Sequence, residues 1–354
     1  MLLYKEVLRH AGSTTIKETF FNSEKKIIAI LELYQDVSPD RTGGVLSVYD
    51  YTGESYRLLR YSQDTNSYKR FRKEGPVLLL TPGWHTTSEA NYSQECKYDK
   101  GLLMEKRIHN IAYNEKESTV YFYEKGAKTI EQKVMTDGSR VTINYVNDSN
   151  GVPLSKATLK DGVFTDQVNY NYQPGGLLSV EQIFKPHNGQ KFAATEKRYF
   201  YNAKKQVEKT EYYGRYNGQL YLYKVEEEIR KGDTVSKKSS GMPELEMAVG
   251  YYDLAALHSY FKENNMEAYI PYYDKDFAAK SRLMQFNYAI DKLDQQGNPV
   301  ETSIMNPEKP EEQLTKVAYR NEYNEDSLLE FVITYILNDK QELEENSIKK
   351  LYYK

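Results

Sequence analysis

Apolar and polar residues alternate in the middle of the chain with a period of two, which is typical of a β-strand with one solvent-facing side. Between residues 168 and 172, one Val and two Tyr residues alternate with two Asn residues, and Pro174-Gly175-Gly176 follows. Pro presets φ and Gly permits φ > 0, so this tripeptide predicts a turn. An apolar face resumes after it, and the same order returns between residues 199 and 207. The pattern therefore predicts two consecutive β-hairpins.

The same strand–turn–strand unit recurs along most of the chain. It combines a Tyr-containing strand, an Asp or Asn, turn residues that often include Gly, and a second strand. Successive copies are centred on Tyr51, Tyr98, Tyr123, Tyr145, Tyr172, Tyr201 and Tyr223, about 25 residues apart from Tyr98 onward, and less regular copies follow at Tyr288, Tyr323 and Tyr335. Two strands with a turn and a return connection need about that length. We therefore predict a mainly β protein, a long antiparallel twisted sheet of repeated β-hairpins.

The repeat pattern is interrupted once, after residue 230. Residues 231–250 are polar and rich in Gly, Ser and Lys, and we predict a linker there. A partly helical insert is expected at 251–285, because Asp253 can cap a helix that carries Leu254, Leu257 and Phe261 on one face. A second short helix is predicted within 275–284. The hairpin sheet then occupies residues 1–230 and continues through residues 286–354.

The composition favours a thin, half-exposed sheet over a thick aliphatic core. The chain of 354 residues contains 34 Tyr and a single Trp, and its mean hydropathy is −0.76. A Tyr ring packs on an apolar surface while its hydroxyl stays in water or on a partner. Abundant Tyr and Phe also argue against disorder. We expect a folded chain with a shallow core.

Charge and hydropathy exclude some classes of partner. The net charge is −3, which gives no basic footprint for nucleic acid. No stretch of the sequence is apolar for long enough to predict a membrane span. Residues 1–15 lack the apolar core of a signal peptide. The expected location is therefore cytoplasmic if Met1 is the native start, and otherwise the cell envelope or exterior after removal of a signal peptide.

The sequence presents no recognisable catalytic or metal-binding constellation. The five histidines are scattered without metal-ligand spacing, and nucleotide-binding and hydrolase motifs are absent. The single cysteine, Cys96, excludes an internal disulfide framework. Cys96 with His85 and Glu89 could form a nucleophile, a base and an orienting group, but a strand cysteine beside a loop histidine is favoured. We predict no catalytic residue, no metal and no cofactor, and rank a hydrolase third.

Two groups of aromatic residues are candidate binding residues. Trp84 and His85 lie in a polar turn, where a core Trp would be unusual, and Trp and Tyr dominate binding hot spots. The pairs Tyr251-Tyr252 and Tyr272-Tyr273 flank the expected helical insert. Ordinary packing is an equal alternative for both groups. The favoured function is non-enzymatic recognition of another protein, and the alternative is carbohydrate binding at a cell surface.

The Tyr-Asp-x-Gly-x-Leu pattern at Tyr98–Leu103 and its weaker copies resemble the YD repeats of the bacterial Rhs/YD family, which is built of consecutive β-hairpins. The resemblance covers about residues 45–230 and returns after residue 285. The family's usual Gly-Arg-Leu turn exit is never intact, and most copies lack the Asp or the Gly. The resemblance implies a binding or scaffolding role within a toxin, immunity or secretion system, with no catalytic residues. Large Rhs proteins enclose a toxin, for which this chain is too short, so an open sheet is expected.

Overall fold

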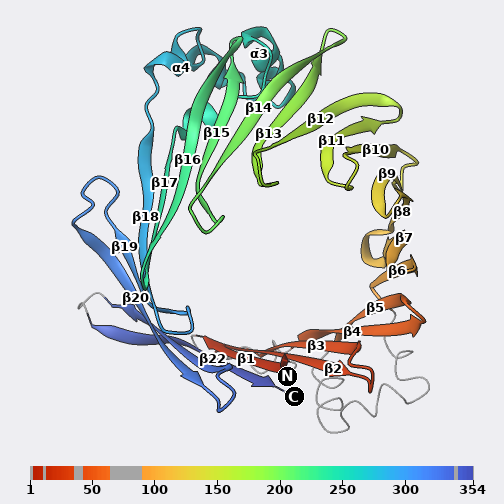
Figure 1. The fold of residues 1–354 in the computed structure, drawn as a ribbon, viewed down its shortest axis with the longest axis vertical. Helices are drawn as coiled ribbons and strands as arrows, with labels where there is room; N and C mark the ends of the chain where they lie inside the picture. The colour runs from red at the N-terminus through yellow and green to blue at the C-terminus, as the bar shows by residue number, and fades with distance from the viewer. Residues whose placement is uncertain (1–2, 11–12, 36–42, 64–89, 339–341, 354) are drawn as a thin grey trace. The chain divides into compact units, whose positions relative to one another are not determined.

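The fold is mainly β, as the alternation predicts. The computed structural model describes residues 3–10, 13–35, 43–63, 90–338 and 342–353, and these residues form 22 strands with a few short helices (Figure 1). The chain divides into two compact units. Unit 1 comprises residues 1–122, 131–140 and 317–354, and unit 2 comprises residues 123–130 and 141–316.

Unit 1 contains the strands from both ends of the chain. They are β1 (Leu3–His10), β2 (Ser13–Phe21), β3 (Ile27–Gln35), β4 (Gly43–Thr52), β5 (Ser55–Gln63), β6 (Tyr92–Asp99), β7 (Leu102–Asn110), most of β8 (Glu115–Glu124), part of β9 (Ala127–Val134), most of β20 (Gln313–Tyr323), β21 (Leu329–Leu337) and β22 (Leu343–Tyr353). Strand β1 pairs with both β2 and β22. An open sheet would leave its first strand unpaired along one edge. Strand β1 has a partner on both sides, so the expectation of an open sheet is wrong at this strand.

The core of unit 1 follows directly from the alternation in its most apolar strand. Ala29, Leu31 and Leu33 occupy alternate positions of β3, so their side chains lie on one face. They are buried there together with Ile16 of β2 and Leu46 of β4. This cluster is small, in agreement with the shallow core expected from the composition.

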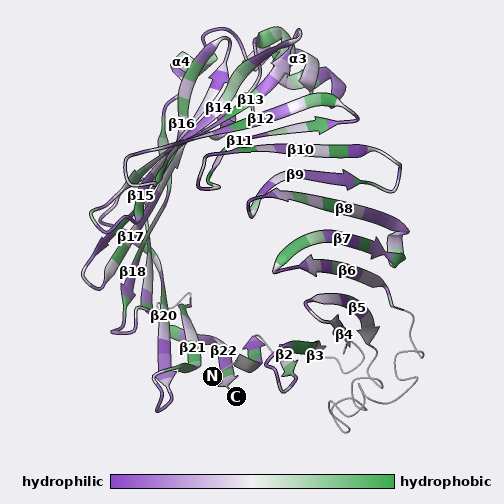
Figure 2. Cartoon of the chain, turned by 45° about the vertical axis from the view of Figure 1, so that its right-hand side comes forward, coloured by the Kyte–Doolittle hydropathy of each residue, from purple (hydrophilic) through white to green (hydrophobic). Residues whose placement is uncertain are grey.

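Unit 2 is a run of hairpins in chain order. Its strands are β10 (Arg140–Asn147), β11 (Pro153–Lys160), β12 (Val163–Tyr172), β13 (Leu178–His187), β14 (Gln190–Tyr201), β15 (Val207–Tyr216), β16 (Gln219–Lys231), β17 (Thr234–Gly241), β18 (Met284–Leu293) and β19 (Pro299–Met305). Neighbours from β10 to β19 pair antiparallel. Hydrophilic and hydrophobic residues alternate along these strands (Figure 2). The two hairpins predicted between residues 168 and 213 are confirmed.

The turns explain why the repeat contains Gly, Asp and Asn. In the two-residue turn between β15 and β16, Asn217 and Gly218 have φ values of 44° and 81°. Positive φ at both positions is the requirement of a type I′ turn, which matches the twist of the strands. In longer turns one Asp or Asn side chain accepts hydrogen bonds from the backbone N–H groups two and four residues later. The residues that do so are Asn22, Asp148, Asn202, Asp294 and Asn324.

A helical insert joins β17 to β18 and lies at one end of the strands β13–β16 (Figure 1). It contains α2 (Pro243–Glu246), α3 (Leu254–Glu263), the 3-10 helix η5 (Glu267–Tyr272) and α4 (Phe277–Lys280). Asp253 caps α3 as predicted, because its Oδ1 accepts a hydrogen bond from the Ala256 N–H at 2.9 Å. Leu257 and Phe261 are buried, which confirms the predicted apolar face of α3.

The segment predicted as a linker, residues 231–250, belongs to the sheet and the insert instead. Strand β16 extends to Lys231, β17 pairs with β16 and β18, and α2 begins at Pro243. The composition was misleading because Ser, Thr and Lys suit a strand with a solvent-facing side. Val235 is the one buried apolar side chain among the β17 residues. The insert therefore begins before residue 251, with α2 at Pro243.

Candidate functional site

The helical insert has a hydrophobic core of its own, shared with the strands beneath it. Tyr216 of β15 is buried against Leu245, Leu257, Phe261 and Tyr273 of the insert. The Tyr216 hydroxyl donates to the backbone oxygen of Asp274 at 2.6 Å, and the Tyr273 hydroxyl donates to that of Glu244 at 2.9 Å. A buried hydroxyl that finds an acceptor avoids the desolvation penalty of an unpaired polar group. The insert is therefore joined to strand β15 by both apolar packing and a hydrogen bond.

The four tyrosines singled out in the sequence have different roles. Tyr273 is only 3% exposed and belongs to the insert core, so it is not available to a partner. Tyr251 is half-buried with its ring 5.2 Å from that of Tyr260, and burial raises its pKa to about 12. Tyr252 and Tyr272 are exposed by 43% and 71%. Trp84 and His85 lie outside the described residues.

Tyr252 makes a contact that the sequence did not indicate. Its ring stacks on the imidazole of His187, with centroids 4.1 Å apart and planes 11° from parallel. The ring of Phe192 meets its edge at 5.4 Å. His187 and Phe192 belong to the β13–β14 hairpin, so this cluster holds the start of the insert against the sheet. His187 and Tyr252 are 65 residues apart in the sequence, so no local pattern could predict their contact.

Four exposed tyrosines lie on the insert, and we call them the insert surface. They are Tyr252, Tyr260, Tyr269 and Tyr272. Three of the four rings are held by neighbours: Phe261 of the insert core contacts Tyr260 and Tyr269, and His187 stacks on Tyr252. A rigid frame that carries exposed rings is suited to binding, because little side-chain freedom remains to be lost on association.

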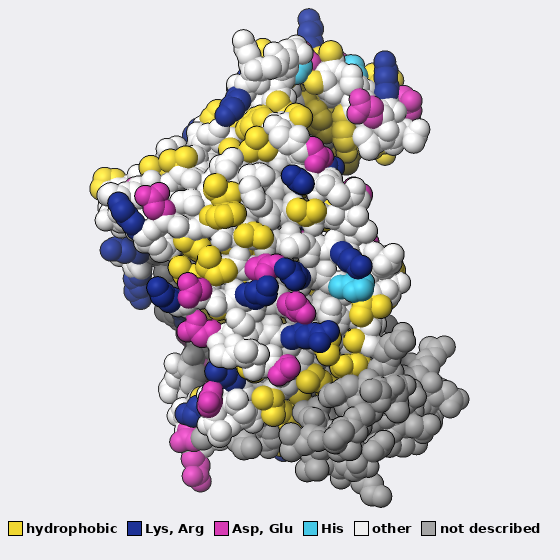
Figure 3. Space-filling model, turned by 90° about the vertical axis from the view of Figure 1, so that its right-hand side faces the viewer, with side chains coloured by type: hydrophobic (Ala, Val, Ile, Leu, Met, Phe, Trp, Pro, Cys, Tyr) yellow, Lys and Arg dark blue, Asp and Glu magenta, His cyan; other side chains and the backbone are white. Residues whose placement is uncertain are grey.

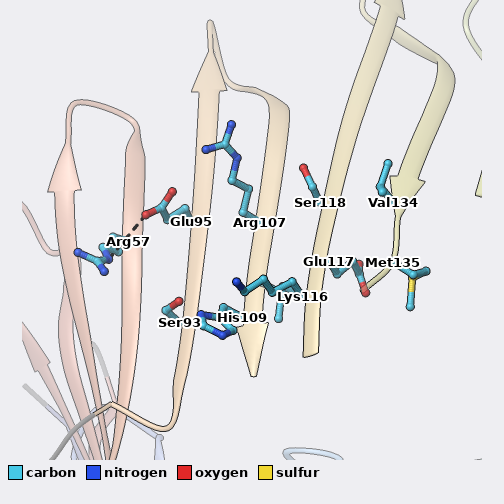
Figure 4. A pocket seen from close by; sticks show the side chains of 11 residues that line it. Arg57, Ser93, Glu95, Arg107, His109, Lys116, Glu117, Ser118, Val134 and Met135 are labelled. Atoms are coloured by element: carbon cyan, nitrogen blue, oxygen red, sulfur yellow. Dashed lines mark ion pairs between the residues drawn. The ribbon is translucent and has the colours of Figure 1, made fainter. Parts of the chain in front are cut away.

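A second candidate lies in unit 1, where side chains of β5–β9 line a groove of about 480 Å³ (Figure 4). Strand register places Arg57, Glu95 and Arg107 in one row across β5, β6 and β7. Ser93, His109 and Lys116 form a parallel row across β6, β7 and β8. Val134 and Met135 lie at the far end of the groove. On the sheet face turned toward the viewer in Figure 3, basic, acidic and histidine side chains lie close together beside hydrophobic ones.

Many ionisable side chains of the described strands form ion pairs. Glu105, for example, accepts hydrogen bonds from Lys97 and Arg107, and the Lys97 bond is the main cause of its lowered pKa. In the described ranges, no group of three or more His, Cys, Asp or Glu side chains is placed to hold a metal ion. Cys96 is a buried residue of β6, and Gln94 Nε2 lies 3.3 Å from its Sγ. Its suggested partners His85 and Glu89 lie outside the described residues.

None of the helices that the structure describes is long and apolar enough to span a lipid bilayer.

Comparison with known proteins gives no family assignment. No family model and no curated protein matches the chain. A porin-like protein from Bacteroides uniformis ATCC 8492 has 8% identity and a TM-score of 0.26, with 99% of this chain and 98% of that chain covered. A DUF3836 family protein from Bacteroides vulgatus ATCC 8482 has 17% identity and a TM-score of 0.18, covering 21% and 79%. The Photorhabdus luminescens Tc holotoxin pore has 10% identity and a TM-score of 0.28, covering 94% and 19%. Similarities at this level carry no argument about function.

Proposed function

We propose that this chain is a non-enzymatic binding protein that recognises another protein through the insert surface. The observation that carries the proposal is the exposure of Tyr252, Tyr260, Tyr269 and Tyr272 on an insert whose own core is buried. Tyr supplies a large contact area with few rotatable bonds, and it is enriched in protein interfaces. The resemblance to YD repeats supports a scaffolding role, and from it we propose a place in a bacterial toxin, immunity or secretion system.

The expected contact is an aromatic patch with a charged rim. Lys262, Glu263 and Glu267 are exposed in α3 and η5, the two helices that also carry Tyr260, Tyr269 and Tyr272. An arrangement of aromatic residues inside a polar rim is the usual anatomy of a protein–protein interface. A single buried Tyr anchor contributes about 2 kcal/mol or more at a binding hot spot. Truncation of the most exposed ring therefore gives a measurable loss.

A photo-crosslinking experiment tests this proposal directly. A photoreactive phenylalanine replaces Tyr272 in one variant and Tyr34 of β3 in a control, since both tyrosines are exposed, at 71% and 52%, and Tyr34 belongs neither to the insert nor to the strands β5–β9 that line the groove. Irradiation in the native extract is expected to yield one discrete protein adduct from position 272 and none from position 34. Tyr252→Ala in the crosslinking chain is expected to reduce the adduct. Equal adducts from both positions, or none from position 272, would contradict the proposal.

Carbohydrate binding is the second candidate, and the stacking of Tyr252 favours it. One face of this ring is covered by His187 and an edge by Phe192, yet the side chain remains 43% exposed. An aromatic ring fixed in this way offers a flat apolar platform for the face of a sugar ring. Titration with a panel of oligosaccharides, followed by tyrosine fluorescence, tests this alternative. Sugar binding that is lost in Tyr252→Ala and kept in Tyr34→Ala would favour sugar over protein.

A further inference from the structure

We propose that the β5–β9 groove of unit 1 binds an acidic peptide segment in an extended conformation. The groove is a different site from the insert surface, so this inference does not depend on the protein-binding role proposed for the insert. Its ligand class follows from three properties of the groove: the charges that line it, the spacing of its cations, and the apolar end formed by Val134 and Met135.

The carboxylates of the groove already have cationic partners. Glu95 lies 3.7 Å from Arg57 Nε, and Glu117 lies 2.6 Å from Lys133 Nζ. Neither carboxylate therefore adds an uncompensated negative charge that would repel an anion. Acidic side chains of a ligand could therefore approach the cations of the groove without repulsion from an unpaired Glu95 or Glu117.

The cations, in contrast, keep hydrogen-bond donors for a ligand. Arg57 and Arg107 each use Nε in an ion pair, and a guanidinium has five N–H donors. Their terminal nitrogens can therefore bind a further carboxylate in the two-pronged geometry that suits arginine. Lys116 is exposed, and within the described ranges its ammonium has no ion-pair partner. Three cationic side chains thus remain available along the groove.

The spacing of these cations matches an extended peptide. Arg57 and Arg107 lie in one row two strands apart, which is about 10 Å. Lys116 is one strand and two residues away from Arg107, a diagonal of about 8 Å. Side chains on one face of an extended peptide repeat every 7 Å or so, and Arg and Lys side chains are long enough to absorb the difference. Acidic residues at alternate positions therefore reach successive cations.

The apolar end of the groove distinguishes a peptide from a sulfated or uronic glycan. Val134 and Met135 are both exposed at this end. A hydrophobic side chain at one end of the peptide would cover them, and methionine adapts easily to different apolar groups. A polyanionic glycan carries no comparable apolar group, so it would leave both side chains in water. The groove therefore fits acidic residues followed by an apolar one.

Fluorescence anisotropy with a labelled synthetic peptide tests the proposal. The probe alternates Glu with Ser over three repeats and ends in Leu, and the control peptide has Gln in place of Glu. The intact chain is expected to bind the Glu peptide, with an affinity that falls as salt is added because the contacts are solvent-exposed charges. The Gln peptide is expected to bind at least tenfold more weakly, roughly the value of one hydrogen bond to a charged group.

Two groove variants and one matched control locate the site. Arg107→Ala and Lys116→Ala are each expected to weaken binding by about threefold to tenfold, in line with exposed charge pairs. Arg320→Ala removes a 65% exposed arginine that pairs with Glu322 elsewhere in unit 1, and it should leave binding unchanged. No binding of the Glu peptide, equal binding of the Gln peptide, or equal effects of all three variants would overturn the proposal. Tighter binding of a sulfated oligosaccharide that Arg107→Ala abolishes would overturn the peptide assignment.

Discussion

Substitution of Gly214 by alanine tests how tightly the helical insert packs on strand β15. This residue is buried in β15, and the backbone beside it binds the insert directly, because Gly250 N–H donates to the Arg215 carbonyl oxygen at 2.9 Å. A Cβ atom added at Gly214 would lie 2.6 Å from Cγ2 and 2.9 Å from Cγ1 of Val249. Contacts this short cannot exist without a shift, and the hydrogen bond next to Val249 restrains that shift.

Gly214→Ala is therefore expected to destabilise the protein, although alanine normally suits a strand better than glycine. Overpacking costs about 1–3 kcal/mol. The reduced freedom of the unfolded chain returns about 0.4–1 kcal/mol. The expected net loss in the free energy of unfolding is thus about 1–2 kcal/mol, measured from urea denaturation followed by circular dichroism.

Val249→Gly provides the internal control for this prediction. It removes every Val249 side-chain atom that the new methyl group would meet. In that background Gly214→Ala is expected to be neutral or stabilising, so the double-mutant cycle should give a coupling energy of about 1–3 kcal/mol. A penalty that persists unchanged in the Val249→Gly background would refute the assigned contact. A stabilising Gly214→Ala in the original chain would refute the close approach itself.

Two further predictions concern the insert core and its tyrosines. Phe261→Ala should lower the free energy of unfolding by about 3–5 kcal/mol, because the ring is fully buried. Phe200→Ala, at an exposed position of β14, should lower it by less than about 1 kcal/mol. Similar losses for the two variants in urea denaturation would contradict the assigned core. Burial raises the pKa of Tyr251 from 10 to about 12, so the unfolded state releases this proton first. The corresponding stability is complete below pH 10 and is lost as the pH rises toward 12. Urea midpoints measured across this range should fall less steeply in Tyr251→Phe, and an identical pH dependence would contradict the assignment.

Features that depend on neighbouring residues were predictable from the sequence. The hairpins follow from a period of two and from turn residues that tolerate positive φ, such as Gly175 and Gly176. The cap of α3 follows in the same way from Asp253 and the spacing of Leu257 and Phe261. In each case the physical cause lies within a few residues, so no knowledge of the rest of the chain is needed.

Features that depend on distant contacts were not predictable. Tyr272 and Tyr273 are adjacent and chemically identical, yet one is exposed and the other is buried. Their difference arises because the chain leaves η5 between them and only Tyr273 reaches the core around Phe261. The polar composition of β17 similarly concealed a strand, because its partners β16 and β18 supply the hydrogen bonds that its sequence does not reveal.

The two candidate surfaces depend on different physical determinants, and this explains why the sequence suggested one and concealed the other. The insert surface arises from residue type, since tyrosines cluster around a helix whose cap and apolar face are local. The groove arises from register, because Arg57, Glu95 and Arg107 form a row only when the strands pair as observed. Side chains alternate between faces, so a shift of one residue at the Lys100-Gly101 turn would move Arg107 to the opposite face. Such a shift leaves every residue of the insert in place, and loss of one surface should therefore leave binding at the other intact.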